Sequence, residues 1–90
     1  MKYPKLIEER NIIYNSDNKI NIAIYKTTYF YDIIISGDNN ILLELKKQDK
    51  YANYIDYSNF GYPILVWDTT DSLDEAKYIV EELCNSFGKW

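Results

Sequence analysis

The sequence predicts an α+β fold, with a single antiparallel sheet of about four to five strands packed by one C-terminal amphipathic helix. Apolar residues alternate with polar ones in several short runs, which is the period of a half-buried strand. Clusters rich in Asn, Asp, Ser and Gly separate these runs, as turns do. A capping pattern followed by helical spacing occupies residues 72–88. The 90 residues contain no linker-like stretch, so we expect one domain, residues 1–90.

Three consecutive runs follow the strand period: residues 20–25, 29–36 and 41–46. Only residues 36–40 separate the last two runs, so we expect these runs to pair as an antiparallel hairpin. The break between the first two runs is Thr27-Thr28. This dipeptide forms either a tight turn or a bulge in one long bent strand.

Two further strands are expected at the ends of this region. Residues 11–14 form the first strand, preceded by a loop or a short turn of helix. Residues 63–67 form the last strand, with a proline at the first position, where a strand tolerates it. Aromatic residues recur every three positions between residues 51 and 60, which favours a short helical turn near residues 48–56, then a loop.

The C-terminal helix has the clearest pattern. Ser72-Leu73-Asp74-Glu75 is a capping box, in which the serine accepts from free backbone N–H groups and the glutamate reaches back. Gly88 stands where helices commonly stop. The apolar stripe that follows the helical period comprises Leu73, Ala76, Val80, Leu83 and Phe87, widened by Ile79 and Cys84.

The composition excludes several kinds of chemistry. Histidine is absent, which removes Ser-His and Cys-His nucleophile pairs, and the single cysteine, Cys84, rules out an internal disulfide and a Cys/His zinc site. Three aspartates, Asp68, Asp71 and Asp74, lack the alternating ligands and the glycine of a calcium loop. We therefore expect no catalytic residues, no metal site and no cofactor. The protein is expected not to be an enzyme.

Charge is distributed unevenly along the chain. Residues 51–90 carry seven carboxylates and two lysines, whereas residues 1–50 are close to neutral, and the whole chain has a net charge of −4. The spacing predicts an acidic ridge along the C-terminal helix, opposite its apolar stripe. It is either an ordinary solvated helix face or a surface for a protein partner with a basic surface. The ridge comprises Asp71, Asp74, Glu75, Glu81 and Glu82.

Tyrosine is the second unusual feature, with ten residues in the chain. A core of this size cannot bury all of them beside 13 isoleucines, and exposed tyrosines are common in binding hot spots. Packing over an open sheet face, together with an AT-rich codon bias, is the alternative explanation. The predicted partner-binding patch comprises Tyr54, Asp56, Tyr57 and Phe60.

Binding to nucleic acid or to a membrane is not expected. Lys46, Lys47 and Lys50 with Tyr51 suggest phosphate neutralisation and base stacking, but solvated lysines at the end of a strand explain them as well. The net negative charge opposes contact with phosphates. No stretch of 18 apolar residues and no signal-peptide pattern occur, so we expect a cytoplasmic location, in a producing bacterium or an infected host.

In size, charge and composition, the whole chain resembles the small acidic inhibitors that phages and mobile elements encode, the anti-CRISPR proteins above all. It is also similar to immunity proteins that block toxin nucleases. Both resemblances imply a non-enzymatic inhibitor that occupies the basic nucleic-acid site of an enzyme with an acidic, tyrosine-rich surface. The alternative is a small structural or regulatory domain that dimerises through a sheet edge or a tyrosine face. The oligomeric state is therefore expected to be either monomer or homodimer.

Overall fold

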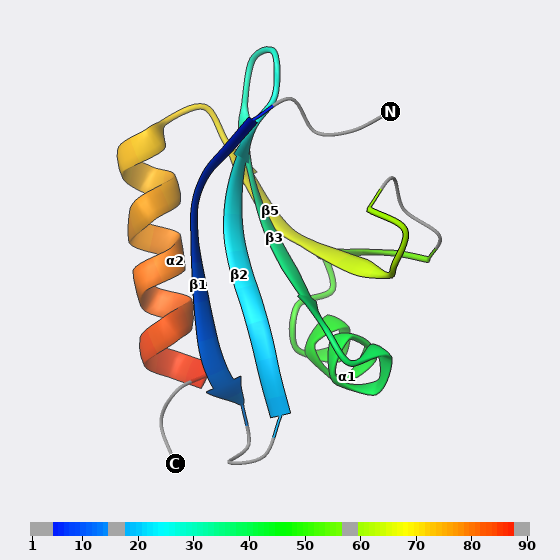
Figure 1. The fold of residues 1–90 in the computed structure, drawn as a ribbon. Helices are drawn as coiled ribbons and strands as arrows, with labels where there is room; N and C mark the ends of the chain where they lie inside the picture. The colour runs from blue at the N-terminus through cyan, green and yellow to red at the C-terminus, as the bar shows by residue number, and fades with distance from the viewer. Residues whose placement is uncertain (1–4, 15–17, 57–59, 88–90) are drawn as a thin grey trace.

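The computed structural model describes residues 5–14, 18–56 and 60–87. In chain order the elements are β1 (Lys5–Tyr14), β2 (Asn18–Lys26), β3 (Tyr31–Gly37), α1 (Asn39–Gln48), β4 (Asn53–Ile55), β5 (Ile64–Thr70) and α2 (Leu73–Phe87). The strands form one antiparallel sheet in the order β1-β2-β3-β5-β4, and α2 lies along it (Figure 1). The expected α+β class, with one antiparallel sheet and a C-terminal amphipathic helix, is confirmed.

The first three strands form a meander with well-defined register. Ile24 lies opposite Ile33 and Ile22 opposite Ile35, so these isoleucines share one face of the sheet. Residues 27–30 make a tight turn, which decides between the two expected forms of this connection. The backbone N–H of Thr27 donates to the carbonyl of Phe30 at 2.8 Å. The strand expected at residues 29–36 accordingly begins at Tyr31.

Strand β1 is longer than the sequence pattern indicates. The strand expected at residues 11–14 is confirmed as the end of β1, but the loop or helical turn expected before it was wrong, because β1 begins at Lys5. The charged residues between Lys5 and Arg10 interrupt the alternation of apolar and polar residues that would predict a strand. They are tolerated because β1 is an edge strand and because a bulge between Leu6 and Glu8 shifts the alternation.

The expected strand at residues 41–46 is instead part of helix α1, so the predicted hairpin with residues 29–36 was wrong. Asp38 caps this helix, because its carboxylate accepts from the backbone N–H of Asn40 at 2.8 Å. Ile41, Leu42 and Leu45 are buried, which is the i, i+1, i+4 pattern of a helix face. The alternation that suggested a strand depends on Leu43, which the structure leaves exposed.

The segment that follows α1 also differs from expectation. A helical turn was expected near residues 48–56, but α1 ends at Gln48 and the short strand β4 occupies Asn53–Ile55. β4 pairs with β5, with Tyr54 opposite Leu65. The period of three among the aromatic residues therefore does not reflect a helix.

Helix α2 agrees with its predicted start. The backbone N–H of Glu75 donates to Ser72 Oγ at 3.3 Å, which is the serine half of the capping box. The N–H of Ser72 donates to Thr70 Oγ1 at 3.3 Å, at the end of a β5 strand that is longer than expected. The predicted stop at Gly88 lies outside the described residues.

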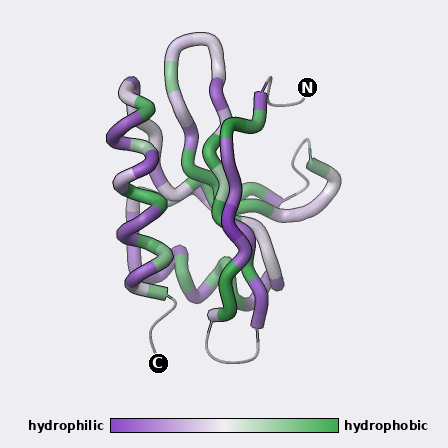
Figure 2. The backbone as a smooth tube through the Cα atoms, turned by 60° about the vertical axis from the view of Figure 1, so that its left-hand side comes forward, coloured by the Kyte–Doolittle hydropathy of each residue, from purple (hydrophilic) through white to green (hydrophobic). Residues whose placement is uncertain are grey.

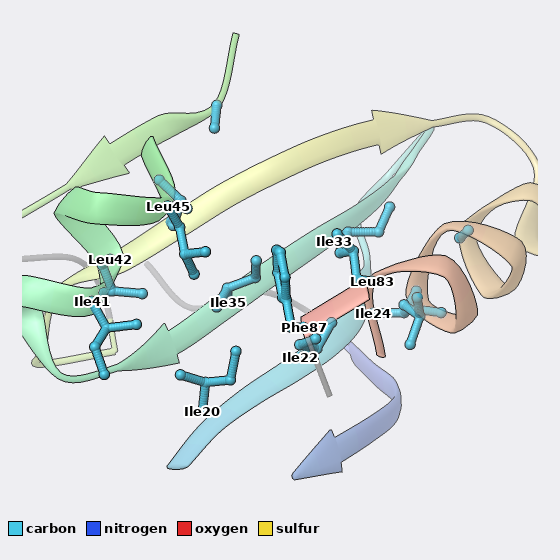
Figure 3. Close-up of a cluster of buried hydrophobic side chains, with 14 residues drawn as sticks. Ile20, Ile22, Ile24, Ile33, Ile35, Ile41, Leu42, Leu45, Leu83 and Phe87 are labelled. Atoms are coloured by element: carbon cyan, nitrogen blue, oxygen red, sulfur yellow. The ribbon is translucent and has the colours of Figure 1, made fainter. Parts of the chain in front are cut away.

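The hydrophobic core lies between the sheet and both helices. Figure 3 shows isoleucines of β2 and β3 pointing toward Leu42 and Leu45 of α1 and toward Leu83 and Phe87 of α2. Along α2 the backbone alternates between hydrophilic and hydrophobic residues, as an amphipathic helix on a sheet requires (Figure 2). Tyr14 and Trp67 contact the Phe87 ring edge-on, with ring centroids 5.7 and 5.6 Å apart. The two helices and these aromatic rings therefore cover one face of the sheet.

Candidate functional site

The outward face of α2 carries carboxylates in two rows. With about 100° of rotation per residue, Asp74 and Glu81 fall in one row and Glu75 and Glu82 in another, roughly a quarter turn away. All four side chains are exposed. Tyr78 stands between the rows and is 64% exposed. The helix thus presents a large aromatic ring flanked by negative charge.

The two rows differ in how far their charge is compensated. Arg10 of β1 pairs with Glu81, with Nη2 and Oε2 3.0 Å apart, and the hydrogen bond and charge of Glu81 raise the pKa of Arg10. Lys77 lies on the same side of the helix as this row. Within the described residues, no cation forms an ion pair with Glu75 or Glu82. The Glu75/Glu82 row is therefore the most negative strip of the helix.

A second exposed aromatic group lies near the start of α2. Tyr31 of β3 pairs with Thr70 of β5, so the turn between β2 and β3 is close to Asp71. Figure 1 shows this turn and the first turn of α2 at the same end of the molecule. Tyr29 and Phe30 in the turn are 79% and 47% exposed. Thr27 holds the turn, because its Oγ1 accepts from the N–H of Phe30 at 3.1 Å.

Tyr54 and Phe60, two of the aromatic residues predicted to bind the partner, do not lie beside the acidic ridge. Tyr54 is half-buried against the core, and its hydroxyl donates to Asn39 Oδ1 of α1. Phe60 packs on Tyr25, with ring centroids 5.2 Å apart, on the face of the sheet away from the helices. Asp56 is exposed just after β4, and Tyr57 lies outside the described residues.

None of the exposed residues Tyr29, Phe30 and Tyr78 was predicted to bind a partner, although Tyr29 is one of the tyrosines too numerous for the core to bury. A signal for Tyr78 was present, because it stands on the helix face opposite the Leu73 and Val80 stripe. No comparable signal exists for Tyr29 and Phe30, since the pattern placed them inside a strand. Their exposure depends on where the tight turn falls.

The lysines considered for nucleic-acid binding have local roles. Lys46 and Lys47 lie in the last turn of α1, and Lys46 Nζ donates to the carbonyl of Lys50 at 2.8 Å. Lys50 Nζ lies 5.1 Å from the centre of the Tyr51 ring. Cations at a helix C-terminus stabilise the helix dipole, so these positions have a structural explanation.

Other reactive groups are few. Cys84 is half-buried, and burial raises the pKa of its thiol, which keeps it protonated and weakly nucleophilic near neutral pH. In the described part of the chain, no three Cys, Asp or Glu side chains gather as a metal-binding group would. Nor does any described helix have the length and hydropathy needed to cross a membrane.

No protein-family model, curated protein sequence or solved structure matches this chain. The charge, exposure and geometry of the surfaces of this chain are what indicate its function.

Proposed function

We propose that this protein is a non-enzymatic inhibitor of a nucleic-acid-processing enzyme, of the anti-CRISPR type, that covers a basic surface of that enzyme with the outward face of α2. The observation that carries the proposal is the uncompensated Glu75/Glu82 row beside the exposed ring of Tyr78. An enzyme that binds nucleic acid presents lysines and arginines to phosphates. A strip of carboxylates attracts the same groups.

The charged and aromatic groups have different roles in this proposal. Long-range attraction between the acidic ridge and a basic partner raises the association rate and weakens as salt screens it. Tyr78 supplies contact area that loses water when the complex forms, which slows dissociation. Tyr29 and Phe30 extend this contact beyond the start of α2, in a turn already held by hydrogen bonds. A preformed turn reduces the entropy lost on binding.

The test is an inhibition assay with a panel of CRISPR effector nucleases and secreted toxin nucleases. We expect the protein to block nucleic-acid binding by at least one of them, and the double variant Glu75→Lys/Glu82→Lys to be at least about tenfold weaker. A matched control, Glu44→Lys/Asp56→Lys, makes the same change of charge on exposed residues away from α2. It should keep most of the inhibition.

The same panel separates the possible outcomes. Inhibition of a toxin nuclease alone would identify an immunity protein instead. If no nuclease is inhibited, or if both double variants lose inhibition equally, the proposal is wrong. Inhibition that does not weaken as salt is raised would also contradict it.

A dimerising structural or regulatory domain is the second candidate, because β1 is an edge strand of ten residues. Leu6 and Ile13 lie opposite Tyr25 and Lys19 of β2 and are partly exposed on one face of the sheet. An unpaired strand edge is a site for pairing with another chain. Light scattering should show a monomer if the inhibitor proposal holds. A dimer that Leu6→Lys/Ile13→Lys dissociates would support the second candidate.

A further inference from the structure

A hollow of about 230 Å³ lies on the face of the sheet opposite the helices. Its floor contains Ala23, Ile34 and Ile64, which are buried but do not belong to the hydrophobic cluster under the helices. These residues alternate along their strands with the core residues, which places them on the other face. The hollow is therefore separate from the outward face of α2.

Aromatic rings form one wall of the hollow. The rings of Tyr25 and Phe60 meet edge-on, with centroids 5.2 Å apart, and the rings of Phe60 and Tyr62 are 5.7 Å apart. Gly61 lies between Phe60 and Tyr62 in the sequence and adopts a φ of 82°, a left-handed conformation that costs glycine no steric energy. This turn brings Phe60 and Tyr62 over the sheet.

The polar part of the hollow is rich in acceptors. It contains the carboxylate of Glu9, the amide of Asn21 and the hydroxyl of Ser36. Asn21 Nδ2 donates to Glu9 Oε1 at 2.8 Å and to Asn11 Oδ1 at 3.1 Å. Both amide hydrogens of Asn21 are thus used, which leaves its oxygen as an acceptor. No lysine or arginine is among the described residues that line the hollow.

The electrostatic surroundings agree with this geometry. Burial raises the pKa of Tyr25, and Tyr62 and Glu9 raise it further. Burial disfavours charge of either sign beside Tyr25, whereas the Glu9 carboxylate disfavours an anion there and attracts a cation.

We propose that this hollow binds the guanidinium group of an arginine side chain. Guanidinium is planar and carries five donors, so it can bond the Glu9 carboxylate while one of its faces stacks on an aromatic ring. Hydrogen bonds between guanidinium and carboxylate are among the strongest that side chains make. The proposal does not depend on the proposed function, because it uses the opposite face of the sheet.

The test is a titration of the ¹⁵N-labelled protein with N-acetyl-L-arginine methylamide, followed by NMR. We expect amide shifts centred on Glu9, Asn21, Tyr25 and Tyr62. Glu9→Gln should weaken binding about tenfold or more, because the charge is lost while Gln Oε1 can still accept from Asn21. The control is Glu8→Gln, which removes the carboxylate of the preceding residue of β1. Glu8 pairs with Ile24 on the helix side of the sheet, so this variant should bind arginine as the wild type does.

Two further measurements complete the test. Phe60→Leu should also weaken arginine binding, and N-acetyl-L-lysine methylamide should bind several-fold more weakly than the arginine compound. Shifts that gather on α2, or that persist unchanged in Glu9→Gln, would overturn the proposal, as would equal binding of the lysine compound. The double variant Glu75→Lys/Glu82→Lys should keep arginine binding, so failure of the proposed function and failure of this site are distinguishable.

Discussion

The two faces of the sheet are covered by different kinds of structure. On one face, isoleucines such as Ile22 and Ile35 are fully buried under two helices. On the other face, Ala23, Ile34 and Ile64 are buried beside Tyr25 and the Phe60–Tyr62 segment, and much of the surrounding surface is polar. The buried residues under the helices are thus almost all aliphatic, whereas on the other face a few aliphatic residues are covered by the rings of Tyr25, Phe60 and Tyr62.

We expect this difference between the two faces of the sheet to separate stability from binding of the proposed arginine ligand. A face packed by aliphatic side chains gains free energy from burial but offers no polar group for a ligand. A face covered by tyrosines has less buried area and keeps hydroxyl groups and ring faces at the surface. We expect substitutions on the helix side to affect mainly the free energy of unfolding, and substitutions on the aromatic side to affect mainly binding.

The largest expected effect is on the helix side. Ile35→Ala removes a side chain with no exposed surface and leaves a cavity, which should lower the free energy of unfolding by about 3–4 kcal/mol. Urea denaturation followed by circular dichroism measures this. A loss below about 1 kcal/mol would mean that the helix-covered face does not carry most of the stability.

Phe60→Ala tests the aromatic side with a larger deletion. Phe60 is only partly buried, so we expect a loss of about 1–2 kcal/mol, less than the roughly 3–5 kcal/mol of a fully buried phenylalanine. The same denaturation experiment applies. A loss as large as that of Ile35→Ala would remove the distinction between the two faces.

Gly61→Ala tests whether the turn that carries the aromatic residues depends on its backbone conformation. An added Cβ would meet no atom within 4 Å, so the φ of 82° is the only source of strain. We expect a loss of about 1 kcal/mol in unfolding free energy. Gly61→Asn is the control, since asparagine tolerates this conformation better and should lose less. Equal losses would contradict the role of the left-handed conformation.

The smallest expected effect concerns pH. The pKa of Tyr25 is raised in the folded protein, so the unfolded chain releases this proton first, near pH 10. The contribution of Tyr25 is fully present below that pH and is lost as the pH rises toward the folded pKa. We expect the melting temperature to fall less between pH 9 and 11 in Tyr25→Phe than in the wild type. The pKa of Cys84 is also raised in the folded protein, so this thiol likewise lowers the stability as the pH rises. Cys84→Ala is therefore the corresponding test on the helix side of the sheet.

The sequence predicted the elements whose local pattern and tertiary environment agree. β2, β3 and α2 have clear periods, and each has one face in the core. α1 was misread because Leu43 completes a strand-like alternation with Ile41 and Leu45, which competes with the helical spacing of Ile41, Leu42 and Leu45 after the N-cap Asp38. β1 was cut short because edge strands admit charge and because its bulge changes the period. Local sequence carries little information on either point.

The candidate site was predictable only in part. The exposure of Asp74, Glu75 and Glu82 follows from the helical period, and the structure agrees with it. The compensation of Glu81 by Arg10 joins residues 71 positions apart, which no local pattern reveals. The position of Phe60 against Tyr25 could not be predicted either, because tertiary packing decides which face of the sheet a turn covers.

The strand order also sets an order of assembly. Only short connections separate β1 from β2 and β2 from β3, so these three strands can pair at little entropic cost. β5 pairs with β3 only after α1 and β4 have intervened in the chain, so this pairing costs more entropy. During synthesis the meander is complete while β5 and α2 are still to be made. We expect the part of the isoleucine face that α1 does not cover to stay open to solvent and to chaperones until Leu73–Phe87 docks, so docking of α2 should end the exposure of the nascent chain to aggregation.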